Sequence, residues 1–337
     1  MPIEINQGRS DNSKFSNGIK NFPKQFEWEP EIGNAGGLFA YQKVIVAGMG
    51  GSALAADLLK MVLQDIEITV HRDYGLPETV LRKSGSKDVL VIASSYSGNT
   101  EETIDAFLEA KKRGLPVAAI TTGGKLLELA QEHKVPYVLI PDIGIQPRMA
   151  TGYLMLALLK LMYEEEKMKE LKMLAKKLNS AHAETEGKAL AANLHVKVPV
   201  IYSSNKNFAL ARIWKIKFNE TGKVPAFANY FPELNHNEMT GFDTRPNTRE
   251  LSEKFHFIFL KDKTDHPRIN RRAAVLEKLF QKKGFGTDEA GIEGGDLFER
   301  IFRTLLIADW AAYYMAKHYH VDPEHVPMVE EFKDLIK

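Results

Sequence analysis

The stretch Ser94-Ser95-Tyr96-Ser97-Gly98-Asn99-Thr100 determines how the sequence is interpreted, because it joins an apolar run to a helical pattern. Residues 88–93 have the composition of a buried strand, and residues 101–113 that of an amphipathic helix. Small hydroxyl residues and a glycine at this junction can surround a phosphate with O–H and N–H donors at the helix N-terminus. The stretch therefore predicts an anion-binding loop in an α/β fold.

The alternative interpretation of this stretch is an ordinary helix cap. Thr100, followed by Glu101 and Glu102, is a favourable helix start. A cap requires one hydroxyl group, whereas the stretch supplies several. We therefore favour anion binding and keep capping by Thr100 as the alternative.

A second glycine-rich loop, residues 48–52, lies between the expected strand 43–47 and the expected helix 53–62. Glycines at such a junction let the backbone turn sharply and approach a ligand. Gly48 and Gly50, with Ala53 in the last position, fit the loop of a dinucleotide-binding fold, so that interpretation stays open. No Lys-Ser/Thr pair follows the glycines, which disfavours a P-loop.

Strands and helices of this kind follow one another along the chain, and the order is repeated in its second half. The expected strands are 43–47, 88–93, 116–121, 135–140, 199–203 and 255–260, and the expected helices of the first half are 53–62, 101–113, 125–132 and 149–176. Residues 208–211 resemble 53–56, and residues 294–299 resemble 123–128. The later pair of matching segments is separated by more residues than the earlier pair. This difference indicates an insertion in the second copy, for which Thr221–Asn247 is the candidate.

The repeat predicts two lobes, each a parallel sheet flanked by helices in a flavodoxin-like three-layer α/β/α arrangement. The expected organisation is an N-terminal extension (1–38), a first lobe with the phosphate loops (39–165), a helical linker (166–191) and a second lobe with the insertion and a C-terminal tail (192–337). Lys261-Asp262-Lys263-Thr264 occupies the place of the serine-rich loop in the second copy. Only the first copy is therefore expected to bind an anion.

Composition excludes several classes of function. The 337 residues contain 45 Lys and Arg against 44 Asp and Glu, so no strong positive field is available for nucleic acid. Cysteine is absent, which excludes disulfides, thiolate metal sites and a cysteine nucleophile and is typical of a cytoplasmic protein. The apolar stretch Tyr153–Met162 contains Lys160 and is too short to cross a membrane. The basic run 265–272 is interpreted as a helix start.

Taken together, the segments 48–53 and 95–103 resemble the signature of the sugar isomerase (SIS) domain. Three later segments, 217–220, 225–227 and 232–241, resemble one branch of this superfamily. That branch is the bifunctional phosphoglucose/phosphomannose isomerases, which are built from two tandem SIS domains. The resemblance extends from about Lys43 to the C-terminus and implies that both lobes are SIS domains.

The resemblance implies a role for particular residues. The sugar phosphate would be held by Gly51, Ser52, Ser95, Ser97 and Thr100. Glu220 would move a proton between C1 and C2, and His236 would open the sugar ring with the help of Lys333. Arg148 would stabilise negative charge on the intermediate. No cofactor or metal would be needed, and the active site would be shared in a homodimer, with Glu220 from one chain and His236 from the other.

The expected reaction accounts for these residue types. Exchange between aldose and ketose through an enediolate needs one base near both carbons, and a carboxylate serves if its pKa approaches neutrality. A fixed guanidinium stabilises the intermediate's charge without losing its own proton. An imidazole titrates in the range useful for ring opening. The ten histidines form no H-E-x-x-H or comparable metal-ligand spacing.

Each of the three main candidates also has an ordinary explanation. Glu220 follows an apolar and basic stretch and fits the surface of a helix, where glutamate is usually found. His236 fits a loop in which it only makes hydrogen bonds. Arg148 fits a position beside an acidic residue at a helix start.

Three other functions are alternatives. A sugar-phosphate-sensing SIS regulator would normally carry a DNA-reading module, and no basic helix-turn-helix pattern is present at either end. An aminotransferring sugar synthase would need a glutamine-hydrolysing domain with a nucleophilic cysteine, and the sequence contains no cysteine. A nicotinamide-dependent dehydrogenase is compatible with the loop 48–52 alone. We therefore expect an isomerase of hexose phosphates and keep the regulator as the main alternative.

Overall fold

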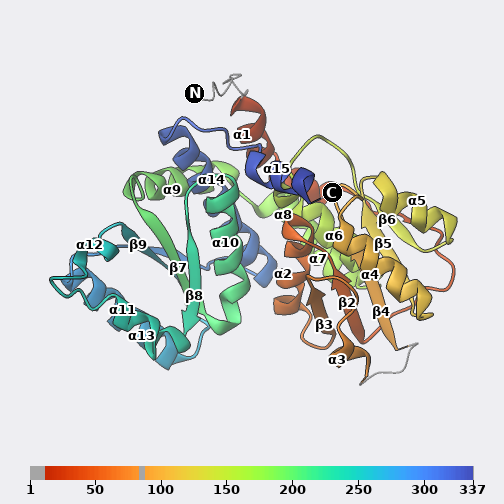
Figure 1. Ribbon diagram of the computed structural model, residues 1–337, viewed down its shortest axis with the longest axis horizontal. Coiled ribbons are helices and arrows are strands. Elements are labelled where there is room, and N and C mark those ends of the chain that lie inside the picture. Colours follow the sequence, from red (N-terminus) through yellow and green to blue (C-terminus); the bar gives the residue numbers. More distant parts are fainter. Residues whose placement is uncertain (1–11, 83–87, 337) are drawn as a thin grey trace. The chain divides into compact units, whose positions relative to one another are not determined.

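The computed structural model describes residues 12–82 and 88–336, which form two compact units (Figure 1). The N-lobe contains, among these residues, 21–82, 88–178 and 296–299. The C-lobe contains 12–20, 179–295 and 300–336. The segments predicted as N-terminal extension and linker are thus each divided between the lobes, at residues 20/21 and 178/179.

The N-lobe contains a six-stranded sheet in the order β1-β6-β5-β4-β2-β3. The strands are β1 (Ile32–Gly33), β2 (Lys43–Ala47), β3 (Glu67–His71), β4 (Val89–Ser94), β5 (Val117–Thr121) and β6 (Tyr137–Leu139). All neighbouring strands are parallel except β1, which pairs antiparallel with β6. The four strands predicted for this half are confirmed, and the edge strands β1 and β3 were missed.

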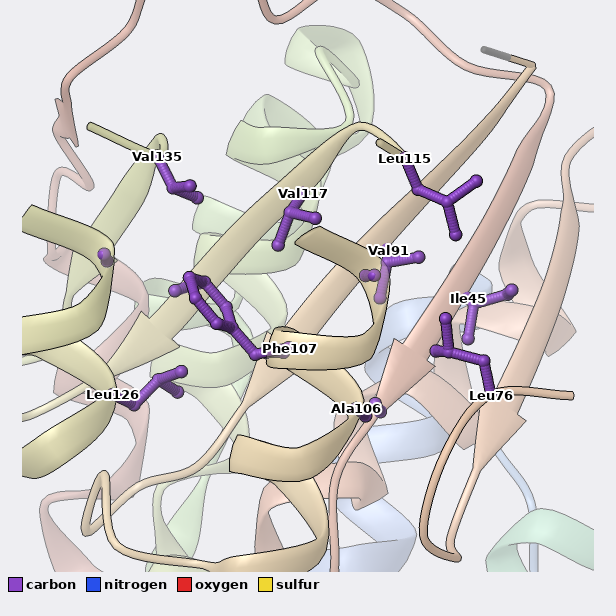
Figure 2. Close-up of a cluster of buried hydrophobic side chains, with 14 of the residues drawn as sticks. Ile45, Leu76, Val91, Ala106, Phe107, Leu115, Val117, Leu126 and Val135 are labelled. Carbon is purple, nitrogen blue, oxygen red and sulfur yellow. The ribbon is translucent and has the colours of Figure 1, made fainter. Parts of the chain in front are cut away.

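Helices cover both faces of this sheet. They are α2 (Leu54–Val62), α3 (Glu78–Leu81), α4 (Glu101–Lys112), α5 (Gly124–Glu132), α6 (Thr151–Leu161), α7 (Glu165–Lys172) and α8 (Leu174–Lys177). On one face, Phe107 of α4 and Leu126 of α5 pack in a buried cluster with Ile45, Val91 and Val117 of the central strands (Figure 2). The alternate strand residues are also buried, and α2 and α6 pack together and contact the sheet. The predicted α/β/α layering is confirmed for this lobe.

The single long helix predicted at 149–176 is wrong. The segment contains the end of a 3₁₀ turn, η3 (Pro147–Met149), and then α6, α7 and α8. After α6, Tyr163 has a φ of 59°, and the N–H of Glu164 donates to the carbonyl of Leu159 at 3.0 Å. A left-handed residue with this hydrogen bond ends a helix. The apolar periodicity of the sequence continues across this break and therefore did not reveal it.

The C-lobe sheet has four parallel strands in the order β10-β9-β7-β8. They are β7 (Val198–Ser204), β8 (Phe227–Phe231), β9 (Phe255–Lys261) and β10 (Gly286–Gly291). The helices are α1 (Asn12–Lys20), α9 (Ser180–Asn193), α10 (Phe208–Glu220), α11 (Glu238–Gly241), α12 (Arg249–Ser252), α13 (Pro267–Lys282), α14 (Leu297–His318) and α15 (Pro327–Leu335). From Arg300 onward, α14 belongs to this lobe.

The predicted insertion Thr221–Asn247 needs correction, because it contains strand β8. In the N-lobe, β2 leads through α2 to β3, which lies beside β2 at the edge of the sheet. In the C-lobe, β7 leads through α10 to β8, which lies beside β7 at the edge. Much of the segment therefore has a counterpart in the first lobe. Its sequence hid the strand because only Phe231 of β8 is buried.

Aromatic residues fill one face of the C-lobe sheet, and α10 covers the other. Phe257 of β9 packs against Phe280 of α13 with ring centroids 4.2 Å apart. On the opposite side, Lys217 of α10 donates to Asp309 of α14 at 2.5 Å, and the two side chains are 3% and 8% exposed. This buried ion pair fixes α10 against α14.

The apolar stretch singled out in the sequence corresponds to α6, which has 11 residues. Within residues 12–82 and 88–336, no helix is both long enough and apolar enough to cross a membrane.

Replacing Lys217 with Met is expected to lower the free energy of unfolding by about 3–5 kcal/mol, because the Asp309 carboxylate stays buried without that ammonium group. The double variant Lys217→Met/Asp309→Leu should lose less, since both charges are then absent. Urea unfolding measures both. Lys215→Met on the same helix is the control, with an expected change of about 0.5 kcal/mol or less. Equal losses in the single and double variants would contradict this account of the pair.

Candidate active site

The two predicted phosphate loops lie side by side in the N-lobe. They follow β2 and β4, which are adjacent parallel strands, so both loops begin at the carboxyl edge of the sheet. The Ser52 hydroxyl accepts a hydrogen bond from the N–H of Tyr96 at 2.9 Å, and the Ser94 hydroxyl donates to the carbonyl of Ser52 at 2.9 Å. These two bonds join the glycine-rich loop to the serine-rich loop. The edge of an α/β sheet at which such loops meet is a common place for ligands.

The serine-rich loop is held mainly by its own hydroxyl groups. Ser95 and Thr100 have hydroxyl oxygens 2.9 Å apart, and the Ser97 hydroxyl accepts from the N–H of Asn99 at 3.3 Å. Thr100 makes no side-chain capping hydrogen bond to α4. The predicted helix start is confirmed, because Thr100 is the N-cap residue of α4, although its hydroxyl does not bond to the helix backbone. Ser97 is exposed, Thr100 is half-buried, and Ser52 and Ser95 are buried.

Gly98 is required where the serine-rich loop meets the turn after β5. Its φ is 70°, and a Cβ atom on it would lie 1.8 Å from the carbonyl oxygen of Gly123. The carbonyl of Tyr96 accepts from the N–H of Thr122 at 3.0 Å and from its hydroxyl at 2.7 Å. The loop is thus fixed against the two strands on either side of it.

Arg148 lies beside the first loop because Gly51 permits close approach. A Cβ atom on Gly51 would lie 2.5 Å from the backbone nitrogen of Arg148 and 2.6 Å from the carbonyl carbon of Pro147. Arg148 belongs to η3, between β6 and α6, and is 2% exposed. The N-lobe therefore brings the backbone of Arg148 to the loop that contains Gly51 and Ser52.

Tyr96 is a candidate residue to which the sequence analysis assigned no role. It lies between two of the serines, is 7% exposed, and its hydroxyl has no hydrogen-bond partner within the described part of the chain. Burial, and then the neighbouring charges of Asp142 and Tyr153, raise the pKa of Tyr96 to about 12. The phenol therefore stays protonated and can donate a hydrogen bond.

The C-lobe holds the remaining candidates, beginning with Glu220 at the end of α10. Glu220 is half-buried, and its backbone carbonyl accepts from the ammonium group of Lys223. The same ammonium group donates to the carbonyl of His325. Asp322 lies 2.6 Å from the imidazole of His325 and raises its pKa. The end of α10 is thus tied to the segment before α15.

His236 and Lys333 are both exposed. His236 follows the short 3₁₀ turn η5 (Glu233–Asn235), directly after β8, and Lys333 lies on α15. Next to His236, Glu238 accepts a hydrogen bond from the hydroxyl of Tyr202 at 2.6 Å and another from the side-chain amide of Asn229. These bonds anchor the loop of His236 to β7 and β8.

Glu220 and His236 of one chain lie at opposite ends of the C-lobe strands: Glu220 on the side of their amino ends, and His236 on the side of their carboxyl ends. Helix α10 begins after the carboxyl end of β7 and has 13 residues, so Glu220 lies about 18 Å along the helix, towards the amino edge. Strand β8 then runs back parallel to β7, and His236 follows its carboxyl end. The C-lobe separates these two residues instead of bringing them together.

The chemistry of the described residues gives no metal centre. In the ranges 12–82 and 88–336, no three His, Asp or Glu side chains are grouped so that they could hold a metal ion.

Comparison with known proteins defines the class of this fold and site. The SIS domain family matches residues 38–164, and the family of bacterial phospho-glucose isomerase C-terminal SIS domains matches residues 183–336. A glucosamine-6-phosphate deaminase from Thermotoga maritima has the same fold, with a TM-score of 0.66 at 17% identity over 93% of this chain and 96% of the other. The molecule is a tandem SIS-domain protein.

The sequence relatives narrow this class. A bifunctional phosphoglucose/phosphomannose isomerase of Caldicellulosiruptor bescii is 34% identical, with 94% of this chain and 97% of the relative covered. An enzyme of the same name from Thermoplasma acidophilum is 34% identical over 97% of this chain and 99% of its own. The chain belongs to the family of bifunctional phosphoglucose/phosphomannose isomerases, which confirms the resemblance found in the sequence.

Gly98→Ala is expected to lower the free energy of unfolding by more than about 2 kcal/mol, from the left-handed backbone together with the clash at Gly123. The displaced loop should also lose most of its affinity for inorganic phosphate. Urea unfolding and calorimetric titration measure the two effects. Gly36→Ala is the control, because a Cβ atom there meets nothing within 4 Å. If the two variants behave alike, the loop is not fixed as described.

Proposed function

We propose that the enzyme interconverts glucose 6-phosphate and mannose 6-phosphate with fructose 6-phosphate by proton transfer through an enediolate. One observation carries the proposal: two hydrogen-bonded loops rich in glycine and serine meet beside Arg148 at the carboxyl edge of the N-lobe sheet. Membership of the family supplies the substrate class.

The substrate phosphate is bound by the two loops. The donors of the first loop come from Gly51 and Ser52. Those of the second loop, which leads into α4, come from Ser95, Ser97 and Thr100. Hydroxyl and backbone N–H donors at the start of a twelve-residue helix bind a phosphate without a lysine. The exposed hydroxyl of Ser97 can turn its proton to a phosphate oxygen, and such a charge-assisted bond contributes about 1.5–3 kcal/mol.

The isomerisation itself needs three further groups. His236, with Lys333, moves the proton of the O1 hydroxyl to the ring oxygen, which opens the ring. Glu220 then removes the proton from C2 and returns it to C1, while the hydroxyl proton of O2 passes to O1, and Arg148 stabilises the negative charge on the enediolate oxygen. Return of the proton to either face of C2 accounts for both aldose epimers. No step requires a metal or a cofactor.

The separation of Glu220 and His236 supports a site built from two chains. Within one chain, strand β8 places these residues at opposite edges of the same sheet. A two-fold dimer resolves the distance, because His236 of one chain then completes the site that contains Glu220 of the other. The proposed active unit is therefore a homodimer.

A coupled assay should show fructose 6-phosphate formation from both glucose 6-phosphate and mannose 6-phosphate, undiminished by a chelator. Glu220→Gln should lose nearly all turnover, because an amide cannot accept the proton, while binding of the sugar phosphate stays within about twofold. Activity that requires an added divalent ion, or near-normal turnover of Glu220→Gln, would refute the mechanism. A folded protein that binds sugar phosphates without turning them over would point to the sensing regulator.

Mixing the inactive Glu220→Gln and His236→Ala homodimers under subunit exchange should restore about a quarter of wild-type activity. Half of the dimers are then mixed, and in each mixed dimer one site receives both substitutions while the other receives none. Activity per chain measures the recovery, with exchange followed independently by a size or mass label. If exchange is complete and no activity returns, both residues serve the same site from one chain.

A further inference from the structure

The carboxyl edge of the C-lobe sheet has the same topology as the phosphate site of the N-lobe. Strands β7 and β9 are adjacent and parallel, as β2 and β4 are, and they lead into α10 and α13 as β2 and β4 lead into α2 and α4. The loops after β7 and β9 are therefore the counterparts of the glycine-rich and serine-rich loops. Their residues are quite different.

A buried carboxylate occupies this edge. Asp262, directly after β9, is 2% exposed, and its Oδ1 accepts from the N–H of Thr264 at 2.8 Å and from the Thr264 hydroxyl at 2.7 Å. Its Oδ2 accepts from Lys206 Nζ at 3.2 Å and from Asn207 Nδ2 at 3.1 Å. Arg300 Nη1 lies 3.6 Å from Oδ1. Backbone N–H, hydroxyl, amide, ammonium and guanidinium donors thus converge on one anion.

A second carboxyl group, that of Asp265, lies beside the same donors. Asp265 lies 3.9 Å from Lys206 and accepts from Asn207 Nδ2 at 3.3 Å. Burial, together with the neighbouring charge of Asp262, raises the pKa of Asp265. Burial also opposes ionisation of Asp262, but hydrogen bonds led by those of Thr264 outweigh it and lower its pKa. Asp262 is therefore the more acidic of the two carboxyl groups.

We propose that this edge is an oxyanion site that the chain fills with its own Asp262 carboxylate. The donors converging on Asp262 are those that proteins use for phosphate and sulfate. The Nε–H of Arg300 is buried and has no hydrogen-bond partner among the described residues, so a larger anion would find a further donor there. The intact C-lobe accordingly takes no phosphate at this edge, and a chain without this carboxylate does.

The internal anion also fixes the start of α10. Asn207 immediately precedes this helix and bridges Asp262 and Asp265, and Lys206 contacts both carboxylates. The site therefore anchors the helix that ends at Glu220. Phosphate binding at this edge, in a chain without Asp262, is measured without turnover. The result therefore does not depend on the isomerase activity proposed above.

The test compares Asp262→Ala/Ser97→Ala with Ser97→Ala, a background in which the N-lobe phosphate site is weakened. Without phosphate, the double variant should unfold at a lower temperature than the background. Inorganic phosphate should restore part of the difference saturably, by about 5–10 °C at a hundredfold excess over its Kd. Sodium chloride at matched ionic strength is the control, and adding Arg300→Gln should abolish the response. An equal phosphate response in the double variant and the background overturns the proposal.

Calorimetric titration of the unmodified protein with inorganic phosphate gives a second, independent measurement, which does not depend on the folding of a variant. We expect one phosphate per chain, with its affinity reduced by Ser97→Ala and unchanged by the exposed control Lys263→Ala. Two phosphates per chain would show that Asp262 does not fill the C-lobe edge.

Discussion

The contact between Gly51 and the backbone of Pro147 and Arg148 is the constraint on which the N-lobe site depends. With a Cβ atom at position 51 only 2.5 Å from the nitrogen of Arg148, no other residue type fits there without displacing η3. Further hydrogen bonds connect this loop across the sheet. The Ser52 hydroxyl accepts from the N–H of Tyr96, and the carbonyl of Tyr96 accepts from the N–H of Thr122. The loops after three strands and the residue expected to stabilise the intermediate thus form one packed unit, in which a shift of any member moves the others.

Among the described residues, the sequence predicted the strands that pair on both sides and missed the strands that pair on one side only. Strands β2, β4, β5, β7 and β9 lie inside their sheets, are covered on both faces, and carry apolar runs that need no further context. The edge strands β3, β8 and β10 were missed because each has a single buried residue and no continuous apolar run, as in the Gly-Thr-Asp-Glu-Ala-Gly sequence of β10. A strand that pairs on one side only is specified by its neighbour, and its own composition does not reveal it.

The same limit applies to the candidate site. The two loops and their place after adjacent strands could be predicted, because glycine and hydroxyl residues at a strand–helix junction act locally. The positions of Arg148, Glu220 and His236 depend on long-range packing, and only the family resemblance indicated them. Their geometry could not follow from the sequence, since β8 was taken as part of an insertion, and it is β8 that puts Glu220 and His236 at opposite edges. Likewise, the loss of the serine loop in the second copy was evident, but the convergence of Lys206, Asn207 and Arg300 on Asp262 was not.

The two lobes share one topology, but different groups fill the carboxyl edge of each sheet. In the N-lobe this edge is lined by hydroxyl and backbone N–H groups, and under the proposed function the energy of binding a phosphate dianion there would be available to orient the substrate. In the C-lobe the corresponding edge is filled by Asp262, so Lys206 and Asn207 already bond to a carboxylate and serve to hold the start of α10. The buried pair of Lys217 and Asp309 holds the same helix one turn before its end. A helix fixed at both places leaves Glu220, the proposed base, little freedom of movement, and proton transfer between two adjacent carbons requires a rigidly placed base.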